Sequence, residues 1–145
     1  PGGLSPGAAP AAAGPAGGGP LASSKLIRRT AAAAAEHGTA VPVVEPADSY
    51  RQTDGTVSHA VDRRRLRIVQ TPQIFRAGLL REAYGADYRP EFTDDASVVE
   101  TAGHSICLCD GERQNLKITT PEDFAVAEAL LAAREENAYE RLPEK

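Results

Sequence analysis

Apolar and polar residues are distributed very unevenly along the 145-residue chain. Residues 1–20 are almost entirely Pro, Gly and Ala, and the first charged residue is Lys25. Glycine and proline disfavour helix and strand, and such a stretch cannot bury enough surface to offset the entropy lost on ordering. We therefore predict a disordered or linker-like segment over residues 1–20 and a folded region over residues 21–145.

The folded region begins with a helical pattern followed by an extended one. Ser23 or Ser24 can cap a helix over Lys25–His37, and Gly38 suits the position just after its last turn. The β-branched, apolar run Thr39–Val44 then predicts a buried strand. A helix that leads directly into such a strand is typical of α/β proteins.

The rest of the chain continues this alternation. Further strands are expected at 66–69, 105–109 and 116–119, and further helices at 76–86, 96–101 and 122–139. The last helix is expected to turn Phe124, Ala127, Leu130 and Leu131 inward. The pattern predicts an α/β fold with a largely parallel sheet covered on both faces, in which ligands bind at the carboxyl ends of strands.

A polar segment interrupts this pattern at residues 46–68. Asp54-Gly55 is a hairpin-turn signal, and the residues on both sides of it are mostly polar. A ribbon that is polar on both faces cannot be a core element, so we expect an arm that projects from the domain and packs on something else. The run Arg63–Arg65 is interpreted as a solvated turn, because no interleaved aromatic residues support nucleic-acid binding.

The amino-acid composition indicates which kinds of binding partner and which cellular compartment are expected. The net charge of −4 and 25% charged residues do not indicate binding to nucleic acid or to an anionic membrane. No apolar run approaches the length of a membrane span. Two cysteines are too few for a disulfide scaffold, so a cytoplasmic location is expected.

Two basic residues are candidates for handling phosphate. Lys117 precedes a strong helix-start signal, Thr-Thr-Pro-Glu-Asp, and Arg76 follows the Thr-Pro-Gln-Ile-Phe stretch. Nucleotidyl transfer needs cations against the charge of its transition state; lysine acts there as a point charge, and arginine can bind bidentately. The Gly-rich residues 14–20 lack a following cation and helix, so they are not interpreted as a phosphate loop.

Other polar clusters have simpler interpretations. Asp48 and Ser49, after a strand, could bind a polyol or orient a phosphate, although a turn is the commoner role of such a pair. Thr93, Asp94 and Asp95 could coordinate a metal, but a helix N-cap is favoured. The histidines and the Cys-x-Cys pair lack zinc-ligand spacing.

Four stretches taken together resemble one enzyme family. They are Asp-Arg at 62–63, Gln-Thr-Pro-Gln-Ile-Phe at 70–75, Thr-Asp-Asp-Ala-Ser-Val-Val-Glu at 93–100 and Asn-Leu-Lys-Ile-Thr-Thr-Pro-Glu-Asp at 115–123. Their order and spacing are similar to those of 2-C-methyl-D-erythritol 4-phosphate cytidylyltransferases over roughly residues 20–135. Ribitol-5-phosphate cytidylyltransferase is the alternative, since it shares the second and fourth stretches; the run at 95–100 favours the methylerythritol family.

The resemblance implies an incomplete Rossmann-like nucleotidyltransferase sheet with a β-hairpin arm, residues 46–68, that forms a homodimer. It implies Mg²⁺-assisted transfer of CMP from CTP to methylerythritol phosphate in the non-mevalonate isoprenoid pathway. Lys117 is then the expected catalytic residue, and Asp48, Ser49, Arg76 and Thr93 are expected to bind substrate. No residue of this chain is assigned as a ligand of Mg²⁺.

The chain also departs from the family pattern. The Gly-rich loop with Arg and Lys that binds the CTP phosphates lies in a half of the family that these residues do not match. The family's acidic stretch ending in Ala-Arg-Pro is replaced by Ala-Gly-Gly-Gly-Pro at 16–20. We therefore expect the chain to be the C-terminal part of the domain, inactive by itself, with residues 1–19 a frame-shifted or artificial lead-in. The alternative hypothesis is a non-catalytic dimerisation or binding remnant.

Overall fold

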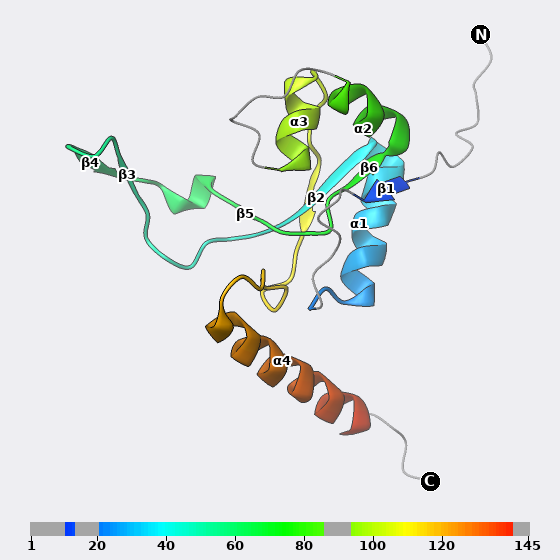
Figure 1. The fold of residues 1–145 in the computed structure, drawn as a ribbon, viewed down its shortest axis with the longest axis vertical. Coiled ribbons are helices and arrows are strands. Elements are labelled where there is room, and N and C mark those ends of the chain that lie inside the picture. The colour runs from blue at the N-terminus through cyan, green and yellow to red at the C-terminus, as the bar shows by residue number, and fades with distance from the viewer. Residues whose placement is uncertain (1–10, 14–20, 86–93, 141–145) are drawn as a thin grey trace.

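The computed structural model describes residues 11–13, 21–85 and 94–140, and Figure 1 shows their arrangement. The helices are α1 (Ser24–His37), α2 (Ala77–Tyr84), α3 (Asp95–Thr101) and α4 (Pro121–Glu140), with a short 3₁₀ helix η1 (Arg63–Arg65). The strands are β1 (Ala11–Ala13), β2 (Thr39–Val44), β3 (Arg51–Thr53), β4 (Ser58–Ala60), β5 (Ile68–Val69), β6 (Ile74–Arg76) and β7 (Leu108–Asp110). The mixed α/β class expected from the sequence is confirmed.

Strand β2 is the centre of the main sheet. Its first residues pair with β6 and its last with β5, both antiparallel, whereas β7 runs parallel to it. The expectation of a largely parallel sheet is therefore wrong for the described strands. After β2 the chain leaves through the arm and returns directly along the same strand, and a return without a crossover helix produces antiparallel pairing.

The arm is a two-stranded hairpin, as predicted. Strands β3 and β4 pair antiparallel, with Arg51 opposite Ala60, and every residue of both strands is exposed. The Asp54 carboxylate accepts hydrogen bonds from the backbone N–H groups of Thr56 and Val57, which closes the turn. Figure 1 shows this hairpin extending away from the sheet and helices.

Local capping signals set the position of α1 against β2. The Ser23 hydroxyl accepts a hydrogen bond from the backbone N–H of Leu26, and Gly38 adopts φ +88°, the left-handed conformation that ends the helix. The buried face of α1 consists of Leu26, Thr30 and Ala34. The order helix, glycine, buried strand agrees with the prediction, and β2 has the predicted bounds.

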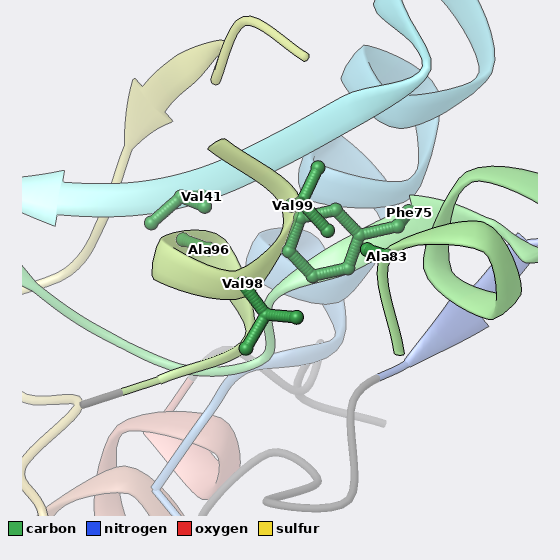
Figure 2. Close-up of a cluster of buried hydrophobic side chains, with 6 residues drawn as sticks. All are labelled: Val41, Phe75, Ala83, Ala96, Val98 and Val99. Atoms are coloured by element: carbon green, nitrogen blue, oxygen red, sulfur yellow. The ribbon is translucent and has the colours of Figure 1, made fainter. Parts of the chain in front are cut away.

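One core cluster lies between β2, β6 and the helices α2 and α3 (Figure 2). It comprises Val41, Phe75, Ala83, Ala96, Val98 and Val99. Phe75 and Val99 are completely buried. These contacts fix the helices α2 and α3 on the sheet, so this cluster is built by residues from β2 to α3 and includes no described residue of α4.

Helix α4 differs from the prediction in what it buries. Of the four residues expected to face inward, Ala127 is buried, Leu130 is half-buried, and Phe124 and Leu131 are exposed by 62% and 39%. Figure 1 shows α4 lying apart from the sheet, and Arg134 attaches it to the segment just before α1 by donating to the Leu21 carbonyl at 2.6 Å. The helical pattern was correct, but the apolar side of α4 is only partly covered, since Phe124 and Leu131 remain exposed.

Strand β1 is a second difference. The sequence predicted no regular structure in residues 1–20, yet Ala11–Ala13 pair antiparallel with β6, from Ala11 opposite Arg76 to Ala13 opposite Ile74. Backbone hydrogen bonding to a neighbouring strand can override the weak strand preference of alanine. The remainder of that predicted segment lies outside the described residues.

Candidate substrate-binding site

The carboxyl end of β2 leads into one set of predicted site residues. Asp48 and Ser49 follow the strand in the chain and are both exposed. Arg63, in the helix η1 at the base of the arm, donates a hydrogen bond from Nη1 to the Ala47 carbonyl. This contact holds the arm's basic turn against the segment that carries Asp48, so a cation and a carboxylate emerge from the same part of the surface.

Lys117 lies in an irregular segment between β7 and α4. The expected strand at 116–119 is absent, because this segment finds no partner strand among the described residues. The backbone N–H groups of Thr119 and Thr120 instead donate to the Asp123 carboxylate, each at 3.0 Å. The Lys117 side chain is exposed, and no hydrogen bond or ion pair to it occurs within the described part of the chain.

The segment that carries Lys117 is anchored on its amino-terminal side by two amides. Asn115 is buried and donates from Nδ2 to the Thr71 carbonyl at 2.6 Å. Gln70 donates from Nε2 to the carbonyls of Glu112 at 2.7 Å and Asn115 at 3.2 Å. The lysine is thereby positioned relative to the end of β5, where the chain returns from the arm.

A capping box anchors the same segment on its other side. The Thr120 hydroxyl accepts a hydrogen bond from the backbone N–H of Asp123, while the Asp123 carboxylate accepts those of Thr119 and Thr120. These backbone hydrogen bonds lower the pKa of Asp123 below its ordinary value. The helix start predicted from Thr120 and Pro121 is confirmed, and it fixes the chain immediately after Lys117.

Arg76 lies at the other end of β2. Its backbone N–H donates to the Gly38 carbonyl, just before the strand begins, and its Nη2 donates to the Ala35 carbonyl at 3.1 Å. A strand of six residues spans about 20 Å, at roughly 3.3 Å per residue. Within one chain the structure therefore does not bring Arg76 together with Asp48 and Ser49; its guanidinium binds the last turn of α1.

The acidic stretch at 94–95 is used to build the fold. Asp94 caps α3 by accepting from the backbone N–H of Ser97 and also accepts from Gln73 Nε2 at 3.1 Å. Asp95 accepts a hydrogen bond from the hydroxyl of Tyr84. Thr93, the remaining predicted site residue, lies outside the described residues.

No metal cage is found in the parts of the chain that the structure describes. No three His, Cys, Asp or Glu side chains lie close enough together there to hold an ion. The carboxylates of Asp94 and Asp95 already accept hydrogen bonds from protein groups. A metal cage built from protein side chains alone is therefore not present among the described residues, and Asp48 is an exposed carboxylate.

The importance of Arg63, Gln70 and Asn115 was not recognised from sequence. All three lie in the stretches that carry the family resemblance, but Arg63 was interpreted only as part of a solvated turn. Their contacts join segments distant in the chain, as in the Gln70 to Glu112 bond. The signal that could have identified Gln70 and Asn115 is a buried or half-buried amide next to an irregular segment, since buried polar groups need partners.

The fold and the placement of these residues define a Rossmann-like α/β domain of the nucleotidyltransferase class. The model of the 2-C-methyl-D-erythritol 4-phosphate cytidylyltransferase family matches residues 16–133. The chain belongs to this family. The chain is 47% identical over 119 residues to a 2-C-methyl-D-erythritol 4-phosphate cytidylyltransferase of Rubrobacter xylanophilus, an alignment that covers 79% of this chain and 52% of that protein.

Further relatives give the same result. The protein of that name from Bacteroides thetaiotaomicron is 44% identical over 107 residues, covering 74% of this chain and 49% of the relative. The crystal structure of the Thermus thermophilus protein superposes with a TM-score of 0.67 at 38% identity, covering 77% of this chain and 56% of that one. The chain thus spans about half the length of the curated relatives it matches, and the ribitol-5-phosphate alternative is not favoured.

No helix in the described ranges has both the length and the apolar character needed to cross a membrane.

Proposed function

We propose that these 145 residues form the methylerythritol-phosphate side of a cytidylyltransferase that transfers CMP from CTP to 2-C-methyl-D-erythritol 4-phosphate. The observation that carries this proposal is the placement of Lys117. An exposed lysine is held between two anchors, the Asn115 contact to Thr71 and the Asp123 capping box. A cation fixed in this way can meet a phosphate with little reorganisation.

The proposed reaction breaks and forms one bond at phosphorus. An oxygen of the methylerythritol phosphate attacks the α-phosphorus of CTP, and the bond from that phosphorus to the bridging oxygen breaks, so that pyrophosphate leaves. Lys117 neutralises the phosphate of the incoming substrate, and Asp48, Ser49 and Thr93 bind its polyol or phosphate groups. Family membership and the exposure of Asp48 and Ser49 support these roles.

The arm supplies a better second cation than Arg76. Arg63 lies at the base of the projecting hairpin and contacts Ala47, whereas the Arg76 side chain is bound to the end of α1. Because Arg63 lies in the arm and belongs to the Asp-Arg stretch that carries the family resemblance, we propose it for contact with the substrate phosphate and retain Arg76 only as a structural residue. The fully exposed hairpin supports a homodimer formed through residues 46–68.

The proposal also covers where CTP and Mg²⁺ bind and in which compartment the protein acts. CTP and Mg²⁺ would be bound mainly by the half of the family fold that this chain does not span, with Mg²⁺ held between nucleotide phosphates and carboxylates. Both cysteines are free thiols, which supports a reducing, cytoplasmic compartment. We therefore expect the 145 residues to release no pyrophosphate by themselves.

A segment exchange tests this function. Residues 21–133 replace the matching segment of the Rubrobacter xylanophilus relative, and pyrophosphate release is measured with CTP, Mg²⁺ and methylerythritol phosphate. The hybrid should be active, and Lys117→Gln should lower kcat/KM by about 100-fold, the size typical of a lost transition-state contact. Lys25→Gln, at an exposed position on α1, is the matched control and should leave the rate unchanged.

Three results would contradict parts of the proposal. A hybrid that folds and dimerises but releases no pyrophosphate would favour the non-catalytic remnant. Equal kcat/KM values for the hybrid with and without Lys117→Gln would show that the lysine has no role in catalysis. Activity with ribitol 5-phosphate in place of methylerythritol phosphate would reassign the substrate.

A further inference from the structure

The side-chain amide of Gln70 makes the pair of hydrogen bonds to backbone groups that a neighbouring strand would otherwise make. Its backbone N–H donates to the Pro42 carbonyl at 2.8 Å, which continues the pairing of β5 with β2. Its Oε1 accepts the backbone N–H of Glu112 at 3.0 Å, and its Nε2 donates to the Glu112 carbonyl at 2.7 Å. One side-chain amide therefore satisfies both backbone groups of a residue in the turn after β7.

The same amide makes a third contact that leads towards Lys117. Gln70 Nε2 also donates to the Asn115 carbonyl at 3.2 Å, while Asn115 Nδ2 donates to the carbonyl of Thr71, the residue after Gln70. The two segments thus exchange side-chain to backbone hydrogen bonds. Lys117 is the charged residue that follows this junction most closely, before the capping box of α4 begins.

The surroundings of the amide leave it little freedom. A Cβ added at Gly111 would lie 2.3 Å from Gln70 Oε1 and 2.9 Å from the Val43 carbonyl oxygen. On its other side, Glu112 accepts a hydrogen bond from the Ser23 hydroxyl at 2.6 Å. The position demands an acceptor towards Glu112 N–H and a donor towards two carbonyls, which a glutamine provides and a glutamate or methionine does not.

We infer that Gln70 is a positioning residue for Lys117, joining the strand that returns from the arm to the segment that carries the lysine. The inference rests on the proposed function, because it assigns Gln70 an effect on binding of the substrate phosphate. Gln70 itself touches no substrate. Its contribution is to fix where the lysine ammonium can reach.

A double-mutant cycle on the full 145-residue chain tests the inference. The dissociation constant of methylerythritol phosphate is measured for the wild type, Gln70→Met, Lys117→Gln and the double variant. Each single change should weaken binding by about tenfold, the lower end of the range for a lost charge-assisted hydrogen bond, and the double variant should be no weaker than Lys117→Gln. Gln114→Met, an exposed amide of the same segment whose Oε1 accepts a long 3.4 Å hydrogen bond from Arg134 Nε, should bind as the wild type does.

A merely structural glutamine would behave differently. Equal binding by Gln70→Met and the wild type, or losses that multiply in the double variant, would overturn the inference while leaving the role of Lys117 intact. If the wild type binds no methylerythritol phosphate, the proposed function fails first and the inference falls with it. Should Gln70→Met not fold, Gln70→Glu serves instead, since it keeps the acceptor for Glu112 N–H and turns a carboxylate oxygen towards the two carbonyls that Nε2 served.

Discussion

Tyr84 donates its hydroxyl hydrogen to the carboxylate of Asp95 and so joins the end of α2 to the start of α3. Asp95 is buried, and Asp94 beside it accepts from Gln73, which is also buried. Desolvation of the hydroxyl, the hydrogen bond to Asp95 and the neighbouring carboxylates raise the pKa of Tyr84 to about 12. The contact therefore requires the protonated phenol.

This contact makes stability depend on alkaline pH. The pKa of Tyr84 is about 12 in the folded protein against an ordinary 10.0, so its contribution is complete below pH 10 and is lost as the pH rises through 12. In a spectrophotometric titration one of the four tyrosines should ionise late. Tyr84→Phe should remove that late phase; a late phase that persists in this variant would assign it to another tyrosine.

A glycine is required at position 111 because the surrounding atoms leave no room for a Cβ. Its Cβ would overlap Gln70 Oε1 and the Val43 carbonyl, so Gly111→Ala should lower the free energy of unfolding by about 1–3 kcal/mol, as measured by chemical denaturation. Gly78→Ala is the matched control, because nothing lies within 4 Å of a Cβ there and the position is helical. That variant should gain about 0.5–1 kcal/mol. Equal effects of the two substitutions would rule out the close approach at Gly111.

The start of α4 should respond to acid. Hydrogen bonds from the backbone N–H groups of Thr119 and Thr120 lower the pKa of Asp123 below 3.8, so its stabilising contribution is present above that value and is lost as the pH falls through the folded pKa. The protection factors of the Thr119 and Thr120 amides, relative to their intrinsic exchange rates, should fall in that range. In Asp123→Ala, which has no side-chain acceptor, the same amides should lose their protection already at neutral pH, and protection unaltered by this change would contradict the capping box.

Substitutions of Arg76 and Arg63 should have different effects on substrate binding. Arg76→Ala removes the donor to the Ala35 carbonyl, and it should cost about 1 kcal/mol of unfolding free energy without changing affinity for methylerythritol phosphate. Arg63→Ala also removes a donor, to the Ala47 carbonyl, but unlike Arg76→Ala it should weaken that affinity, by about tenfold. Calorimetric binding and denaturation curves on the same samples distinguish these outcomes, and the reverse pattern would restore Arg76 to the site.

The sequence predicted what depends on neighbours in the chain. The bounds of β2, the hairpin turn at Asp54 and N-caps within Ser23–Ser24 and the 93–95 stretch were all predicted from residues within a few positions, and the structure selects Ser23 and Asp94 as the caps. The side-chain to backbone contacts of Gln70 could not be predicted in this way, because its partner Glu112 lies in a distant segment. The local order of residues determines where helices and strands form, whereas contacts between distant segments depend on the tertiary fold.

The same distinction explains the errors. Leu116–Thr119 has an extended, apolar character, but the backbone N–H groups at its end donate to Asp123 and no strand forms. Phe124 and Leu131 follow helical periodicity, yet no described segment covers them. Arg76 lies next to a stretch shared with the family, and its hydrogen bonds to the Gly38 and Ala35 carbonyls place it at the opposite end of β2 from Asp48.

The double anchoring of Lys117 has a thermodynamic consequence. A catalytic lysine on a long mobile loop would lose backbone entropy each time substrate bound, at about 1–2 kcal/mol for each residue ordered. Here Asn115 and Asp123 hold the chain on both sides, so that loss has already occurred during folding. Under the proposed function, only the rotamers of one side chain remain to be restricted when the substrate phosphate binds, so the charge of Lys117 is preorganised for that role.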